Sequence, residues 1–182
     1  MLQIQFIEEY LPIYPKSDCW HECFSLQFNT LIMRPYKGLI MDNPNFKVLF
    51  ENKVMTVGHV FETSFCINKF TNEEFAVFEF DNEPTCGLVG QYNDWCLIGG
   101  DVLVLKTWID NTLRLVGELK DIFDLKLIDA YTIHVLTNPW MDGSEIWQVS
   151  LDLNQLSRPM TLTKIRDFNE YSDKPYSDKV VW

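Results

Sequence analysis

The most distinctive chemical feature of the sequence is the stretch of residues 70–105, which is rich in carboxylates and contains no lysine, arginine or histidine. Its acids are Glu73, Glu74, Glu79, Asp81, Glu83, Asp94 and Asp101. Residues 75–81 alternate in type, which predicts a strand with Glu79 and Asp81 on one face. Two carboxylates about 7 Å apart on a strand could serve glycoside hydrolysis or bind a cation. A solvated strand face gives the same pattern, and we favour that plainer interpretation.

The charge balance of the whole chain favours a positively charged partner. The sequence has 15 lysines and arginines against 26 aspartates and glutamates, for a formal net charge of −11. This charge repels phosphate backbones and anionic lipids, so we expect neither nucleic acid nor a membrane surface as a partner. The leading hypothesis is a non-enzymatic acidic binding protein. Its most specific form is an immunity or inhibitor protein that binds a basic protein such as a bacterial toxin.

The uncompensated acids of the stretch supply the candidate partner-binding residues. We expect them to cluster on one exposed face with few basic residues among them, where they would speed the approach of a cationic partner. The predicted partner-binding residues are Glu73, Glu74, Glu79, Asp81, Glu83 and Asp94.

Other chemistry has weaker support in the sequence. Cys19, His21 and Cys23 are three potential metal ligands within five residues, but the second ligand pair of a structural zinc site is missing. We therefore expect no metal and no cofactor. The sequence has no Gly-x-Ser-x-Gly motif and no phosphate-binding glycine loop, which disfavours serine hydrolysis and nucleotide hydrolysis. Enzymatic activity stays uncertain and a non-catalytic role is favoured.

Two alternative functions remain open at this point. Four tryptophans could form a stacking platform, which makes a small-ligand or carbohydrate-binding β module the first alternative. These residues are Trp95, Trp108, Trp140 and Trp147. A carboxylate-dependent hydrolase that uses Glu79 and Asp81 is the second alternative.

The pattern from Phe46 onward is typical of antiparallel strands, because short apolar runs alternate with turn residues about every ten positions. The predicted strands are 46–50, 53–61, 64–70, 75–81, 95–98, 101–108, 112–118, 123–127, 131–136, 145–153 and 160–165. Glu51-Asn52, Gly99-Gly100, Asp110-Asn111 and Asp142-Gly143 mark turns between them. The predicted fold is mainly β (all-β or α+β), with an antiparallel meander that forms a barrel, a sandwich or a small propeller-like array.

The sequence predicts a single domain, 1–182, in three parts. Residues 1–45 form a mixed segment with one or two helices, residues 46–168 form the β-meander, and residues 169–182 form a polar tail whose apolar end docks. Residues 97–107 and 127–137 resemble each other as a weak internal repeat.

The start of the sequence lacks the pattern of a signal peptide, and no apolar run approaches the roughly 18 residues of a membrane span. Five cysteines, an odd number, predict reduced buried thiols and a cytoplasmic location.

Overall fold

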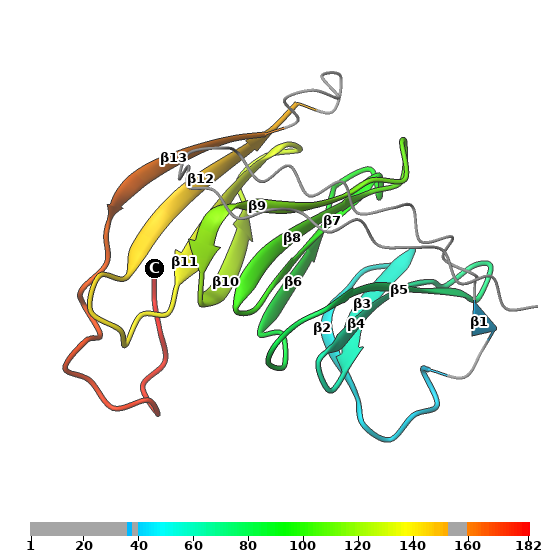
Figure 1. Ribbon diagram of the computed structural model, residues 1–182, viewed down its shortest axis with the longest axis horizontal. Coiled ribbons are helices and arrows are strands. Elements are labelled where there is room, and N and C mark those ends of the chain that lie inside the picture. The colour runs from blue at the N-terminus through cyan, green and yellow to red at the C-terminus, as the bar shows by residue number, and fades with distance from the viewer. Residues whose placement is uncertain (1–35, 38–39, 153–159) are drawn as a thin grey trace, which may run out of the picture. The chain divides into compact units, whose positions relative to one another are not determined.

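The computed structural model describes residues 36–37, 40–152 and 160–182, and these residues form β-strands and no helix (Figure 1). The strands are β1 Tyr36–Lys37, β2 Phe46–Glu51, β3 Met55–Val60, β4 Thr63–Asn68, β5 Glu73–Glu79, β6 Cys86–Val89, β7 Trp95–Gly99, β8 Val102–Thr107, β9 Leu113–Lys120, β10 Ile122–Leu127, β11 Thr132–Thr137, β12 Glu145–Leu151 and β13 Met160–Asp167. Within the described part of the chain, no helix is long and apolar enough to cross a membrane.

The strands pair into three antiparallel sheets. Their strand orders are β1-β5-β4-β3-β2, β6-β7-β8-β9 and β10-β11-β12-β13, so each sheet is a meander of consecutive strands, to which β1 adds one edge strand. The first and last strands of each sheet do not pair with each other, and none of the three sheets closes into a barrel. The prediction of a mainly β, antiparallel meander is confirmed, and its barrel alternative is wrong.

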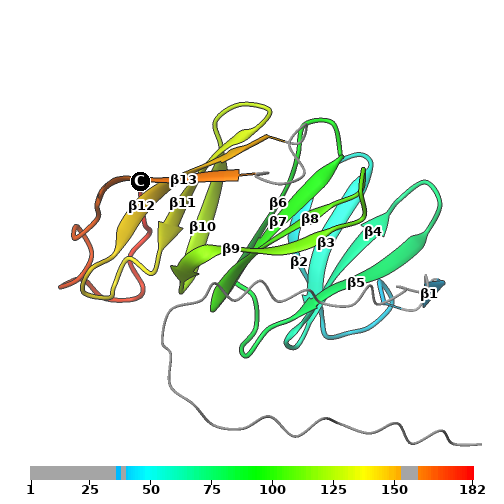
Figure 2. The ribbon, with the colours of Figure 1, turned by 45° about the horizontal axis from the view of Figure 1, so that its top comes forward.

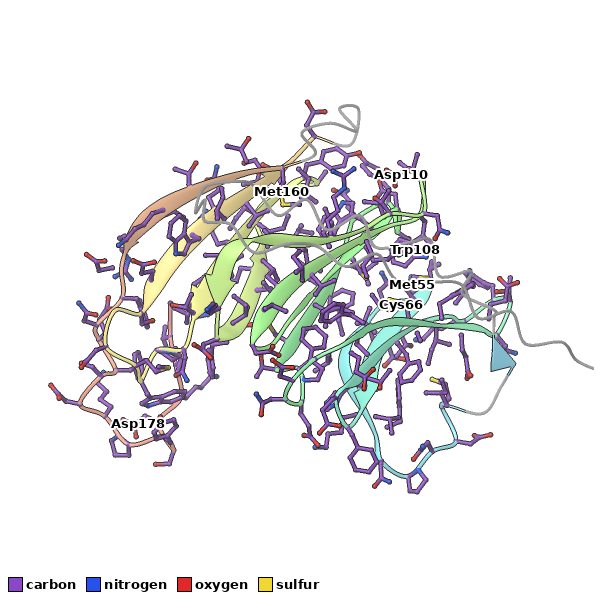
Figure 3. All side chains as sticks on the ribbon, in the orientation of Figure 1. Met55, Cys66, Trp108, Asp110, Met160 and Asp178 are labelled. Atoms are coloured by element: carbon purple, nitrogen blue, oxygen red, sulfur yellow. The ribbon has the colours of Figure 1, made fainter. Side chains whose placement is uncertain are left out.

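Sheet β6–β9 lies between the other two sheets and is buried on both faces (Figures 1 and 2). Every residue of β7 is buried. Trp95 and Leu97 belong to the core shared with sheet β10–β13, whereas Cys96 and Ile98 belong to the core shared with sheet β2–β5. Met55 and Cys66 are members of this second core (Figure 3). A strand buried on both faces reads as a continuous apolar run, which is the pattern that β7 shows.

The first strands of the three sheets connect these layers. Strand β6 contacts β2 on one side and β10 on the other. Each sheet contains four consecutive strands, β2–β5, β6–β9 or β10–β13, and these four-strand units begin at Phe46, Cys86 and Ile122. The weak repeat in the sequence is out of phase with this unit, because residues 97–107 lie in β7 and β8 whereas residues 127–137 span the β10–β11 turn.

All 11 predicted strands are present, with ends that differ by at most two residues. The sequence pattern missed β1, which has two residues, and β6, which has four residues and includes Gly87. The expected helices fall on residues outside the described part of the chain.

The residues of the predicted turns are needed for two different physical reasons. Asn111 and Gly143 have positive φ values of 54° and 79°, as tight turns require. Gly99 is needed for close packing instead, because a Cβ there would lie 2.6 Å from Ile122 and 2.7 Å from the Cys86 sulfur.

The C-terminal segment folds back onto the third sheet, and its apolar end docks as predicted. The Trp182 indole donates a hydrogen bond to Asp124 Oδ2 at 2.8 Å, and Lys126 lies over the indole ring at 4.1 Å. Tyr176 stacks on Trp140 with ring centroids 4.8 Å apart. Trp140 and Trp182 pack against a core cluster of the third sheet that includes Leu136 and Phe168.

The buried thiols give the first prediction. Cys66, Cys86 and Cys96 are buried free cysteines, and burial raises the pKa of Cys86 to about 12. The thiolate is the reactive form, so these thiols should react with an aromatic disulfide reagent at pH 8 far more slowly than after denaturation. The measurement uses a Cys19→Ser/Cys23→Ser background, so that only the three described thiols are counted. Rapid reaction of the folded protein would contradict their burial.

The close packing at Gly99 gives the second prediction. Gly99→Ala should lower the free energy of unfolding by about 1–3 kcal/mol, because the added methyl group overpacks the contact with β10. Gly143→Ala is the comparison variant, since a Cβ there meets nothing within 4 Å and only the positive φ opposes it. Chemical denaturation of both variants measures the difference. An equal or smaller loss at Gly99 would show that the contact relaxes freely.

Candidate functional site

The turns of the three sheets gather at two opposite ends of the strands. At one end, the β2–β3 and β6–β7 turns are joined by a hydrogen bond from Asn52 Nδ2 to Asn93 Oδ1 at 2.8 Å. The β6–β7 and β10–β11 turns meet through the rings of Tyr92 and Tyr131, whose centroids are 6.3 Å apart. We call this end the tyrosine end.

The other end is a continuous row of turns from all three sheets. Phe80 N donates to Glu62 O at 3.0 Å, which joins the β5–β6 connection to the β3–β4 turn. Ile122 N donates to Gly100 O at 2.7 Å, and Asn138 N donates to Asp121 O at 2.7 Å. These bonds join the β7–β8, β9–β10 and β11–β12 turns, so residues distant in the sequence share one surface.

This second end carries an excess of exposed carboxylates, and we call it the acidic end. Its exposed acids include Glu62, Glu79, Asp81, Glu83, Asp121 and Asp142. Lys47 and Lys120 are the exposed lysines beside these turns in the described part of the chain. Lys47 is already paired with Glu83, with Nζ and Oε2 2.5 Å apart.

The cations of the neighbouring strand β13 are also neutralised. Lys164 forms ion pairs with Glu145 and Asp167, and Arg166 pairs with Glu170. Within residues 40–152 and 160–182, no ion pair is found for five exposed acids of the acidic end. These acids are Glu62, Glu79, Asp81, Asp121 and Asp142.

The structure divides the six predicted partner-binding residues. Glu79, Asp81 and Glu83 lie at the acidic end, where β5 ends and leads into β6. Glu73 lies at the start of β5 and Asp94 in the β6–β7 turn, both at the tyrosine end.

The expectation that all six residues share one exposed face is wrong for Glu74. Its side chain is buried, at 1% exposure, and both carboxylate oxygens lie 3.2 Å from the backbone N–H of Ile40. A carboxylate held in this way serves the fold of the first sheet, since a buried charge needs hydrogen-bond partners.

Sequence reasoning missed three residues of the acidic end. Glu62, Asp121 and Asp142 come from turns outside the acid-rich stretch. A partial signal was present, because alternate turns of a meander fall at the same end of one sheet, but this pattern does not show how the ends of different sheets align.

A cavity of about 470 Å³ opens at the acidic end beside sheet β10–β13. Its apolar lining includes Leu119, Met141, Trp147 and Leu162, and its polar lining includes Lys120, Asp121, Asn138, Asp142 and Glu145. The indole N–H of Trp147 donates to Glu145 Oε2 at 2.7 Å, which holds the ring in place.

The four tryptophans do not form one platform. Trp95 is fully buried, and Trp108 packs against the core between the first two sheets at the tyrosine end (Figure 3). Trp140 donates to Pro175 O at 3.1 Å beneath the C-terminal segment. Trp147 alone among the four lines the cavity.

The described residues contain no group of three or more histidines, cysteines, aspartates or glutamates that could hold a metal ion. Cys19, His21 and Cys23 lie outside the described part of the chain. Glu79 and Asp81 are exposed on the strand end and do not line the cavity, so the geometry does not enclose them as an acid–base pair.

Comparisons with known proteins assign no family. No family model matches the chain. No curated protein matches it either. A chain in a solved complex of variant Saccharomyces cerevisiae Dbp5 with Nup159, variant Gle1, IP6 and ADP is similar over 72% of this chain and 33% of that chain, with 11% identity and a TM-score of 0.42. The similar region spans about a third of that chain, and a similarity of this degree supports no functional argument.

The Lys47–Glu83 pair gives a prediction about the electrostatics of the acidic end. The hydrogen bond from Lys47 holds the pKa of Glu83 below its usual value. Lys47→Met should therefore raise the pKa of Glu83, measured by carboxyl ¹³C NMR titration. Because the pKa of Glu83 is lowered on folding, its contribution to stability is present above the unfolded pKa and is lost as the pH falls through the folded pKa. This part of the pH dependence should shrink in the variant.

Lys120→Met is the matched control for this measurement, since it also removes one exposed lysine of the acidic end. It should leave the pKa of Glu83 much closer to that of the wild type. An unchanged Glu83 pKa in Lys47→Met would mean that the ion pair does not form in solution.

Proposed function

We propose that the protein is a non-enzymatic acidic binding protein that engages a basic protein through the acidic end. The observation that carries this proposal is the gathering of exposed carboxylates from four connections of three sheets on one surface, with few cations to neutralise them. Glu79, Asp81 and Glu83 remain in the proposed surface, and Glu62, Asp121 and Asp142 are added to it.

The support beneath these turns favours binding with little rearrangement. The turns are joined to one another by backbone hydrogen bonds, such as Asn138 N to Asp121 O. Two of them, the β5–β6 and β9–β10 connections, adjoin sheet β6–β9, whose two faces are packed. A surface held in place before binding loses less conformational entropy when a partner arrives.

The charge of this surface would act mainly on the rate of association. Exposed carboxylates steer a positively charged partner toward the surface and repel polyanions. A bacterial toxin with a cationic active site is one partner that this mechanism would suit, with the protein acting as its inhibitor in the cytoplasm. That choice of partner rests on charge alone.

We propose further that the three sheets form a small propeller-like array. Supporting this arrangement, three successive four-strand units have their first strands, β2, β6 and β10, in contact through β6. In such an array, the turns at one end of the sheets form a shared binding surface.

A small-ligand or carbohydrate-binding role is the second candidate, and the cavity beside Trp147 favours it. A carboxylate-dependent hydrolase has less support, because Glu79 and Asp81 lie outside that cavity.

A double charge reversal tests the proposal. Glu79→Lys/Asp81→Lys should weaken binding of a nona-arginine peptide about tenfold at low salt, mainly through slower association, and the difference should shrink at high salt. Stopped-flow fluorescence measures the association rate, and the fold stability should change by less than about 0.5 kcal/mol because both side chains are exposed.

The control variant Asp173→Lys/Asp178→Lys makes the same change in net charge on the exposed C-terminal segment. It should slow association much less if the acidic end is the binding surface. Equal effects of the two variants would show that only net charge matters. The proposal of a local site would then fail.

A further inference from the structure

We propose that the cavity at the acidic end accepts an arginine side chain of the basic partner. This inference rests on the proposed function and adds a specific contact to it. The cavity lies where the β9–β10 turn meets the β11–β12 turn, within the row of turns that forms the acidic end.

The interior of the cavity suits the apolar stem of an arginine. Leu119 is buried, while Trp147 and Leu162 are half-buried and pack against the core between the second and third sheets. The stem of a long cationic side chain commonly covers apolar surface while its head reaches polar groups. The volume of about 470 Å³ is within the range of pockets that bind small groups.

The rim of the cavity suits the cationic head. Asp121 and Asp142 are exposed lining residues with no ion pair to any described residue. Glu145 is already occupied by Lys164 and by the indole N–H of Trp147. Lys120 also lines the rim and repels a cation. Asp121, Asp142 and Lys120 together carry a net charge of one negative unit.

The hydrogen bonding of the β11–β12 turn favours a cation over a sugar. Thr137 Oγ1 accepts from Glu145 N at 2.8 Å, and Ser144 Oγ donates to Thr137 O at 3.2 Å. Asn138 Oδ1 accepts from Trp140 N at 3.2 Å. With these groups engaged in the turn, the carboxylates are the main polar partners at the rim, and a carboxylate attracts a cation by charge in addition to accepting its hydrogen bonds, whereas a sugar hydroxyl offers the hydrogen bond alone.

Among cations, a guanidinium fits this lining better than an ammonium. It is planar and weakly hydrated, it stacks on an indole face, and it presents several N–H donors to two carboxylates at once. Trp147 with Asp121 and Asp142 offers these partners within one cavity.

The experiment uses three blocked pentapeptides in which one arginine, lysine or citrulline is flanked by glycines. Binding to the whole protein is followed by the ¹⁵N-indole NMR signal of Trp147, which Trp147→Phe identifies. The arginine peptide should shift this signal with a Kd at least threefold lower than the lysine peptide, and the neutral citrulline peptide should cause no shift.

The decisive variant is Asp121→Asn/Asp142→Asn, which removes charge at nearly constant shape. Asparagine tolerates the positive φ of 51° at Asp121, so the turn should be kept. The variant should raise the Kd of the arginine peptide at least tenfold, whereas the control Asp173→Asn/Asp178→Asn should leave it unchanged. Lys120→Gln should lower the Kd about twofold or more.

The outcomes separate this inference from the proposed function. If nona-arginine binding depends on Glu79 and Asp81 but the arginine peptide does not shift the Trp147 signal, the cavity proposal is overturned and the acidic end stands. A shift caused by a neutral sugar and not by the arginine peptide overturns it as well. If the arginine peptide binds as expected while Glu79→Lys/Asp81→Lys has no effect on nona-arginine, the cavity proposal holds and the wider surface fails.

Discussion

The packing of sheet β6–β9 on both faces is the constraint on which the other features depend. Trp95 and Leu97 face one core and Cys96 and Ile98 face the other, and all four are fully buried. Burying each such side chain contributes about 1.5–3 kcal/mol, so shifting this strand relative to either neighbouring sheet would be costly. Gly99 allows β10 to approach closely at the end of the same strand.

This packing also determines which turns meet. Because β6 lies against both β2 and β10, the connections that precede these strands fall at the same end, where Gly100 accepts a hydrogen bond from Ile122. The opposite turns meet through Asn52 and Asn93. Carboxylates in unrelated parts of the sequence are thus brought to one surface by the core, without direct interactions between them.

The sequence was sufficient to predict all strands except β1 and β6, because residue alternation and turn chemistry act locally. It was insufficient for the site, since alternation shows which face of a strand a residue occupies and not which end of the sheet. Glu73 and Glu79 belong to one strand and yet lie at opposite ends of it. The buried carboxylate of Glu74 contacts the backbone at Ile40, a long-range contact without a pattern in the sequence. Asp121 and Asp142 could be joined to Glu79 only after the order of the sheets was known.

The unneutralised charge of the acidic end has a modest cost in the free protein. Exposed like charges interact weakly through water, and salt screens them over about 8 Å at physiological ionic strength. Ion pairs such as Lys47–Glu83 in turn stabilise the fold little, because both side chains are largely exposed. A protein can therefore keep many unpaired carboxylates on rigid turns with a small loss of stability. A cationic partner would relieve their mutual repulsion on binding. In the cavity beside Trp147, one arginine would make a desolvated contact, and its electrostatic interaction with the carboxylates there would be stronger than on the open surface.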